Sequence, residues 1–154
     1  MPTLRPIAPG DLDTIVRHRS AMFRDSGRPT DVIAELEAPF CAWLKPRLAD
    51  GRYFGWIAEE EGAPVAGIGM MEIEWPPHPS HPTSDRRGYI LNVYVEPAYR
   101  RRGLAKRLMA AATDEAKARG LEFVVLHATE QGRPLYASLG WTSSREMAIS
   151  IPKD

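Results

Sequence analysis

The stretch Tyr-Val-Glu-Pro-Ala-Tyr-Arg-Arg-Arg-Gly-Leu-Ala, residues 94–105, carries the strongest structural signal in this chain. It joins an apolar run to a helical pattern through a short turn. The first four N–H groups of a helix have no partner inside it, and the helix dipole adds partial positive charge at that end. Gly103 allows close approach to the backbone, Ala105 keeps the next turn small, and three arginines add charge. The stretch therefore predicts a pyrophosphate site at the start of a helix, in preference to a solvated basic turn.

The residues around this stretch predict an α/β fold with one mixed sheet. Strand 89–95, helix 102–119 and strand 121–128 form a right-handed crossover unit. Apolar periodicity places the remaining elements, namely a strand at 3–8, helices at 12–25 and 31–49, a hairpin of strands at 53–60 and 63–74, a short helix at 132–139 and a final strand at 141–151. This β-α-α-β-β-β-α-β-α-β order predicts helices on both faces of the sheet.

Prolines and glycines mark the irregular places in these elements. Pro39 and Pro46 predict a kink or a break in the second helix. Gly67 and Gly69 predict a bulge or a close backbone approach in the second strand of the hairpin. Residues 75–88, WPPHPSHPTSDRRG, predict a loop, and long loops in small domains are often lids or binding loops.

The turn motif resembles that of a known family. Arg100-x-x-Gly103-x-Ala105 matches the Gln/Arg-x-x-Gly-x-Gly/Ala pattern of the GCN5-related N-acetyltransferases, the GNAT family. Asn-Val-Tyr-Val-Glu-Pro at 92–97 is similar to that family's central strand, and Leu-Tyr-x-x-Leu-Gly-Trp at 135–141 resembles its Tyr-x-x-x-Gly-Phe segment. The motif is short, but its place after a strand makes it specific. The resemblance covers nearly the whole chain and implies a GNAT-like acyl-CoA N-acyltransferase fold, with residues 1–154 as a single domain.

The resemblance implies acetyl-CoA as the acyl donor and assigns the residues that bind it. Main-chain N–H groups of the motif would hold the pyrophosphate, and the motif residues are Arg100, Arg101, Arg102, Gly103, Leu104 and Ala105. Main-chain groups of Val93, Tyr94 and Val95 would hold the pantetheine arm as an extra strand, with the Val93 N–H as an oxyanion donor. Thr129 stands where many members carry Asn, and a hydroxyl replaces only one of the two contacts that an amide makes.

Two residues are the first candidates for proton transfer. Tyr136 is the candidate general acid, because a departing coenzyme A thiolate needs a proton and a phenol beside the sulfur can supply one. Glu72, near the end of the hairpin's second strand, is the first candidate for the base that deprotonates the amine, with Glu74 on the same face one step further. His127, Glu96 and water are the alternatives to Glu72.

Composition limits the other function classes. Lys plus Arg and Asp plus Glu both number 20, so the net charge is zero and nucleic acid is not an expected partner. Cys41 is a lone cysteine, which excludes an intrachain disulfide and fits a reducing cytoplasm. His78 and His81 lie among prolines without helical spacing, so no metal is expected. No secretion signal and no run of about 18 apolar residues is visible, so neither export nor a membrane span is expected.

The predicted function is direct acetyl transfer from acetyl-CoA to a primary amine of a small molecule or peptide, without a metal or a covalent enzyme intermediate. The loop at 75–88 and the first two helices would form the acceptor side, where Arg86 and Arg87 suggest a carboxylate near the amine. A non-catalytic acyl-CoA-binding sensor is the main alternative. A nucleotide-binding enzyme is the second alternative. The absence of the Lys-Ser/Thr pair of a P-loop from the motif argues against it. Exposed strand edges would permit a homodimer.

Overall fold

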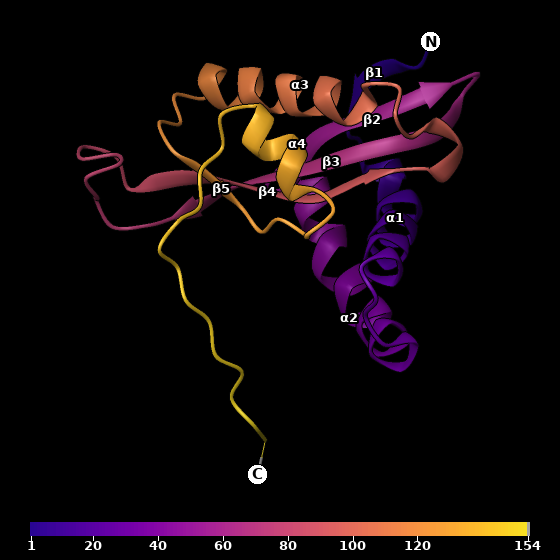
Figure 1. The fold of residues 1–154 in the computed structure, drawn as a ribbon, viewed down its shortest axis with the longest axis horizontal. Coiled ribbons are helices and arrows are strands. Elements are labelled where there is room, and N and C mark those ends of the chain that lie inside the picture. The colour runs from indigo at the N-terminus through magenta and orange to yellow at the C-terminus, as the bar shows by residue number, and fades with distance from the viewer. Residues whose placement is uncertain (154) are drawn as a thin grey trace.

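Five strands form one mixed sheet in the computed structural model, which describes residues 1–153 (Figure 1). They are β1 (Thr3–Pro6), β2 (Phe54–Glu60), β3 (Ala63–Glu74), β4 (Arg86–Val95) and β5 (Val124–Leu126). The helices are α1 (Leu12–Asp25), α2 (Thr30–Ala49), α3 (Leu104–Ala118) and α4 (Arg133–Ser138), with short 3-10 turns at Pro9–Asp11 and Pro97–Tyr99. The sheet order is β1-β2-β3-β4-β5, antiparallel except for the parallel pair of β4 and β5. The predicted mixed α/β architecture is thereby confirmed.

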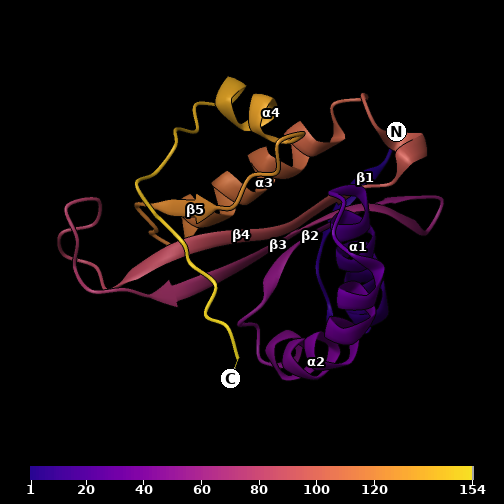
Figure 2. The same ribbon diagram turned by 60° about the horizontal axis from the view of Figure 1, so that its bottom comes forward.

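The helices cover both faces of the sheet, as the element order predicts. Figure 2 shows α3 and α4 on one side and α1 with α2 on the other. Side chains alternate between these sides along a strand, so Ile68 and Met70 of β3 pack toward α3, whereas Met71 packs toward α1 and α2. Each side therefore has its own apolar core, and the sheet separates them.

Helix α2 runs without a break from Thr30 to Ala49, so the predicted split of this helix is wrong. Pro39 and Pro46 are both exposed. A proline removes one N–H and leaves one carbonyl of the preceding turn unpaired. Water can bond that carbonyl at an exposed position, and burial of Ile33, Phe40 and Leu44 stabilises the helix.

The C-terminal part departs most from the prediction. Strand β5 has only three residues instead of the expected 121–128, and the expected strand at 141–151 is absent from the described part of the chain. A strand exists only when a neighbour pairs with its backbone, and residues 142–153 leave the body instead of returning to β5 (Figure 1). The alternating pattern is present, but within residues 1–153 it has no pairing partner.

The loop between β3 and β4 is tied down at several points. It is shorter than the expected 75–88, because β4 already pairs with β3 at Arg86. The N–H of Trp75 bonds to the carbonyl of Asp85 at 2.9 Å and closes the hairpin. His81 is fully buried, and its Nε2 accepts hydrogen bonds from the guanidinium of Arg87 at 3.0 and 3.1 Å. His81 thus has a structural role, and no group of three metal-ligating side chains lies together among residues 1–153.

Candidate active site

The turn before α3 presents a row of unpaired main-chain donors. Arg101 and Gly103 adopt left-handed conformations, with φ of 62° and 75°, and these two reversals direct successive N–H groups into the same space. Within residues 1–153 the N–H groups of 101–105 have no hydrogen-bond partner. The N–H of Arg100 differs, because it bonds to the carbonyl of Pro97 at 3.3 Å. The expected donor row therefore begins one residue later, at Arg101.

Space for a ligand lies against this donor row. A Cβ placed on Gly103 would meet no atom within 4 Å, so the region in front of the turn is open. Leu104 starts α3 and is buried in the core, which fixes the helix end below the opening. Ala105 follows with a side chain too small to fill it. Open space, free N–H groups and a helix N-terminus together suit an anion.

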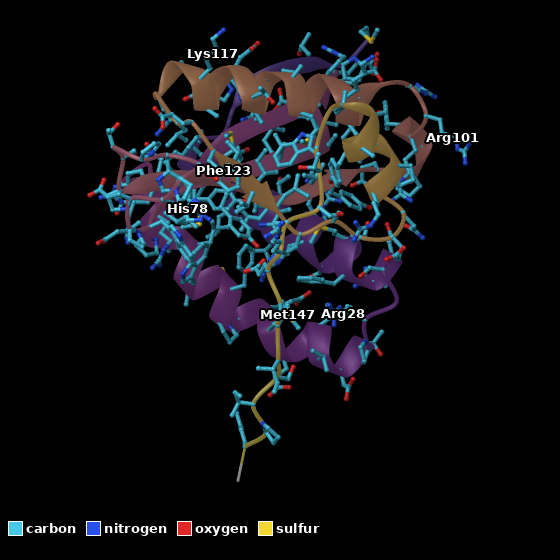
Figure 3. The ribbon with its side chains drawn as sticks, turned by 60° about the vertical axis from the view of Figure 1, so that its left-hand side comes forward. Arg28, His78, Arg101, Lys117, Phe123 and Met147 are labelled. Atoms are coloured by element: carbon cyan, nitrogen blue, oxygen red, sulfur yellow. The ribbon has the colours of Figure 1, made fainter. Side chains whose placement is uncertain are left out.

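The three arginines of the motif have different positions. Arg100 turns back, where its Nε donates to the carbonyl of Val95 at 2.8 Å and its Nη2 pairs with Asp25 at 2.5 Å. It therefore ties α1 to the end of β4. Arg102 stacks over the ring of Tyr99 at 5.3 Å. Arg101 extends into solvent at the rim of the turn (Figure 3). Of the three arginines, Arg101 and Arg102 therefore make no ion pair among residues 1–153 and leave positive charge beside the donor row.

Strand β4 leaves one edge free beyond its first half. Its pairing with β5 covers only Gly88 to Ile90. The segment from 91 to 95 has β3 on one side and no strand on the other within the described residues. The two strands thus splay apart beyond Ile90, and the free edge of β4 runs toward the donor row at 101–105. An extended chain such as a pantetheine arm can add to such an edge.

A bulge interrupts β4 at the middle of this free edge. Leu91 pairs with Gly69 and Tyr94 pairs with Gly67, so two residues, Asn92 and Val93, stand opposite one. Asn92 has a left-handed φ of 57°. The extra residue turns the main chain at this point, which is how bulges commonly re-aim groups beside active sites. Glycines 67 and 69 had predicted this irregularity, and the structure places the added residue on β4.

Successive side chains from the bulge onward face opposite layers. Val93 and Val95 pack against the α3 core. The ring of Tyr94 lies on the other face, 5.0 Å from the ring of His18. Of the three residues predicted to hold the pantetheine arm, Tyr94 can therefore contribute only its main chain. Asn92, for which the sequence predicted no role, is buried and donates from Nδ2 to the hydroxyl of Tyr53 at 2.9 Å.

Tyr136 lies on α4, across the splay from β4. Its ring packs on the α3 core beside Trp141, with ring centroids 6.4 Å apart. Burial raises the pKa of the Tyr136 phenol above its ordinary value, so the group stays protonated at neutral pH. Its hydroxyl has no hydrogen-bond partner among residues 1–153. A protonated and unengaged phenol has the properties that the predicted acid needs.

Thr129 has a local role that competes with ligand contact. Its Oγ1 accepts the N–H of Gly132 at 3.1 Å, and its carbonyl accepts the N–H groups of Gly132 and Arg133. These bonds form the turn that starts α4 and so position Tyr136. The hydroxyl retains its own proton for a ligand, but it cannot replace the two contacts of an asparagine amide.

Glu72, the first candidate for the base, lies apart from the other candidates for proton transfer. Its carboxylate lies 3.5 Å from the guanidinium of Arg119 at the end of α3. Its neighbours Met71 and Ile73 point the other way, into a cavity beneath α1 and α2. Alternation along β3 thus separates Glu72 from that cavity by the thickness of the sheet. A base that must reach an amine in the cavity is not favoured at this position.

The cavity on the α1 and α2 side has a volume of about 540 Å³. Its walls are aliphatic and aromatic apart from one guanidinium and one phenol, and the lining residues are Arg19, Leu36, Pro39, Phe40, Trp43, Met71, Ile73, Tyr89 and Leu91. Pockets of this size and character commonly bind small molecules. The sequence predicted that the first two helices form the acceptor side, but it did not identify these lining residues, because side chains from four elements converge here only after folding.

His127 contacts this cavity indirectly. Its Nδ1 lies 2.9 Å from the hydroxyl of Tyr89, and its Nε2 lies 3.0 Å from Glu146. Glu96, the other alternative base, pairs with Arg17 at 2.5 Å and lies 3.8 Å from the Nε2 of His18. His127 is therefore the titratable alternative that the structure connects to the cavity.

Comparison with known proteins agrees with this arrangement. The model of the acetyltransferase (GNAT) family matches residues 13–141. A GCN5-related N-acetyltransferase from Ralstonia eutropha JMP134 has 56% identity and a TM-score of 0.97, with 98% of this chain and 99% of that chain covered. A protein described as a predicted acetyltransferase from Clostridium acetobutylicum, solved with acetyl-CoA, has 28% identity and a TM-score of 0.89 over 98% of this chain and 96% of its own.

A curated relative matches only in part. The glucosamine 6-phosphate N-acetyltransferase of Trypanosoma brucei brucei is 32% identical over 65 residues, which are 42% of this chain and 44% of that protein. The chain thus matches less than half the length of this relative. None of the helices among residues 1–153 has the length and apolar character needed to cross a membrane. The family model covers most of the sequence, and on that ground the chain belongs to the acetyltransferase (GNAT) family.

Proposed function

We propose that this chain transfers the acetyl group of acetyl-CoA directly to a primary amine bound in the cavity beneath α1 and α2. The observation that carries the proposal is the continuous path from the unpaired N–H groups at 101–105 to the free edge of β4 and its bulge. A diphosphate fits the first part and an extended arm with amides fits the second. The relative from Clostridium acetobutylicum, solved with acetyl-CoA, supports this choice of donor.

The bulge lies where the two substrates would meet. Its free edge faces the splay between β4 and β5, and its Asn92 side chain faces the α1 and α2 layer. The N–H of Val93 would donate to the thioester oxygen and stabilise the charge that develops there, an effect worth about 3 kcal/mol in other enzymes. An amine in the cavity would then approach the carbonyl carbon from the opposite side.

The chemistry needs two proton movements. The amine nitrogen forms a bond to the carbonyl carbon, the carbon–sulfur bond breaks, and Tyr136 gives its proton to the sulfur. The amine proton leaves to water in the cavity or to Tyr89, which can pass its own proton to His127. No residue of the chain forms a bond to the acetyl group in this scheme. Bulk solvent restores the proton on Tyr136.

Two measurements test the proposal against a non-catalytic sensor and against a nucleotide enzyme. Thermal unfolding should respond to acetyl-CoA and not to ATP or NAD, since a ligand at 100 times its dissociation constant adds about 2.7 kcal/mol of stability. Release of free thiol with a panel of amines should then show turnover. Tyr136→Phe should lower kcat by about 100-fold or more while leaving the affinity for acetyl-CoA unchanged. Thiol release at the wild-type rate by Tyr136→Phe at all pH values would remove the phenol from the mechanism.

A further inference from the structure

Arg19 is a cation in a largely apolar site. Its guanidinium lies 4.2 Å from the ring centroid of Phe40 and 4.9 Å from that of Phe23. Its Nε donates to Oδ1 of Asn92 at 3.1 Å. Within residues 1–153 it has no carboxylate partner, and its two Nη groups make no hydrogen bond. A half-buried charge of this kind is costly unless a ligand pairs with it.

The available part of Arg19 has a defined geometry. A guanidinium binds a carboxylate through two parallel N–H···O bonds, and both Nη groups are free for such a contact. The contacts with the Phe23 and Phe40 rings and with Asn92 at Nε limit the orientations of the fork. Arg19 also lines the cavity, so the fork can reach a ligand there. The site is thus prepared for one planar anion.

The anion site lies beside the proposed reaction centre. Arg19 bonds to Asn92, which is the residue next to the proposed oxyanion donor Val93. A ligand that gives its anion to Arg19 and its amine to the thioester therefore has these two groups close together. An α-amino carboxylate meets this condition, because one carbon carries both groups. The remainder of the cavity, with Leu36, Trp43 and Met71 among its walls, would surround a third substituent that is apolar.

We propose that the acceptor is a free α-amino acid with a large apolar or aromatic side chain, whose carboxylate binds Arg19. This inference rests on the proposed acetyl transfer and specifies its substrate class. Polycationic amino sugars fit poorly, because the lining includes no carboxylate and one guanidinium would repel them. A sugar phosphate would place several hydroxyls against aromatic walls without hydrogen-bond partners. The arginines at 86 and 87 are not needed, since Arg87 is occupied by His81.

The test compares three phenyl-bearing amines, of which one has a carboxylate and two do not, with two amino sugars. Initial rates of thiol release are measured with L-phenylalanine, L-phenylalaninamide and 2-phenylethylamine, and with an aminoglycoside and glucosamine 6-phosphate. The wild-type kcat/KM should be about 10- to 100-fold higher for phenylalanine than for the two compounds without the carboxylate, as expected for one charged hydrogen-bonded pair. Equal rates for the three, or a preference for either sugar, would overturn the inference without any variant.

Substitutions of Arg19 test whether this side chain causes the preference for the carboxylate. Arg19→Met should bring phenylalanine and 2-phenylethylamine to within about 3-fold of each other, since the lost contact is worth the full preference. Arg19→Lys should retain part of the preference because it keeps the charge but loses the fork. Arg24→Met, on the exposed side of the same helix, is the matched control and should leave the ratio unchanged. A wild-type ratio in Arg19→Met with normal thermal unfolding would overturn the assignment.

The outcomes separate this inference from the proposed function. Turnover with polar amines and none with apolar amino acids would sink the substrate class and leave acetyl transfer standing. Binding of acetyl-CoA without thiol release in the presence of any amine would instead count against the proposed function itself.

Discussion

Gly103 and Gly120 allow donor binding to be measured separately from backbone strain. They flank α3, with φ of 75° and 73°, and a Cβ on either would meet no atom within 4 Å. An L-residue in this left-handed region costs roughly 1–2 kcal/mol. Gly103→Ala and Gly120→Ala should therefore lose about the same stability, which for a domain of this size lowers Tm by about 2–8 °C.

Only one of the two variants should lose donor affinity. The Cβ at 103 would enter the space in front of the unpaired N–H groups, whereas position 120 lies at the opposite end of the helix. Titration calorimetry with acetyl-CoA should show a dissociation constant raised about 10-fold or more for Gly103→Ala, the effect of losing one or two charge-assisted hydrogen bonds. Gly103→Glu, which adds a negative charge, should abolish binding. If Gly103→Ala bound acetyl-CoA as tightly as Gly120→Ala, the donor site would lie elsewhere.

Three further changes probe the layers around the site. Burial, and after it the charge of Arg17, lower the pKa of His18 to about 4. Between pH 6.5 and 4 the unfolded chain therefore binds a proton at His18 that the folded chain does not bind. The free energy of unfolding should accordingly fall by about 3 kcal/mol as the pH is lowered over this range. Acid unfolding of His18→Gln followed by circular dichroism should lack this component. Leu108→Ala, fully buried under the sheet, should cost about 2–5 kcal/mol in urea unfolding. Asn92→Gly keeps the left-handed backbone but removes the amide, so kcat/KM for the acceptor should fall about 10-fold while donor affinity is retained.

Local signals in the sequence were sufficient for most of the fold. Helix α1 and strand β3 have the expected bounds, because each has a clear apolar period and ends at a turn residue. The motif at 100–105 lies at the start of a helix, as its glycine and its position after a strand predict. These features depend on neighbours in the chain, and such neighbours are visible without a structure.

Features that depend on distant partners were not predictable in the same way. Arg100 was expected to supply an N–H to the donor, but that group bonds to Pro97, and its side chain reaches Asp25, 75 residues away. Glu72 was chosen for its place on a strand, and Arg119 on α3 decides where its carboxylate lies. The expected last strand has the right alternation without a partner in the described chain. Periodicity gives the propensity of a segment, whereas pairing depends on what the rest of the fold brings beside it.

The bulge in β4 connects the donor path with the acceptor cavity, and the motif at 100–105 alone could not predict that connection. Gly69 is required beside the bulge, because a Cβ there would lie 1.9 Å from the hydroxyl of Tyr53. That hydroxyl accepts from Asn92, and Asn92 in turn accepts from Arg19, so a chain of hydrogen bonds runs from Tyr53, just before β2, through the bulge to α1. The bulge thus lies on the free edge of β4 and places Asn92 against Arg19, which lines the acceptor cavity. Donor path and acceptor cavity share one strand irregularity, and a change that straightened β4 would be expected to impair both together.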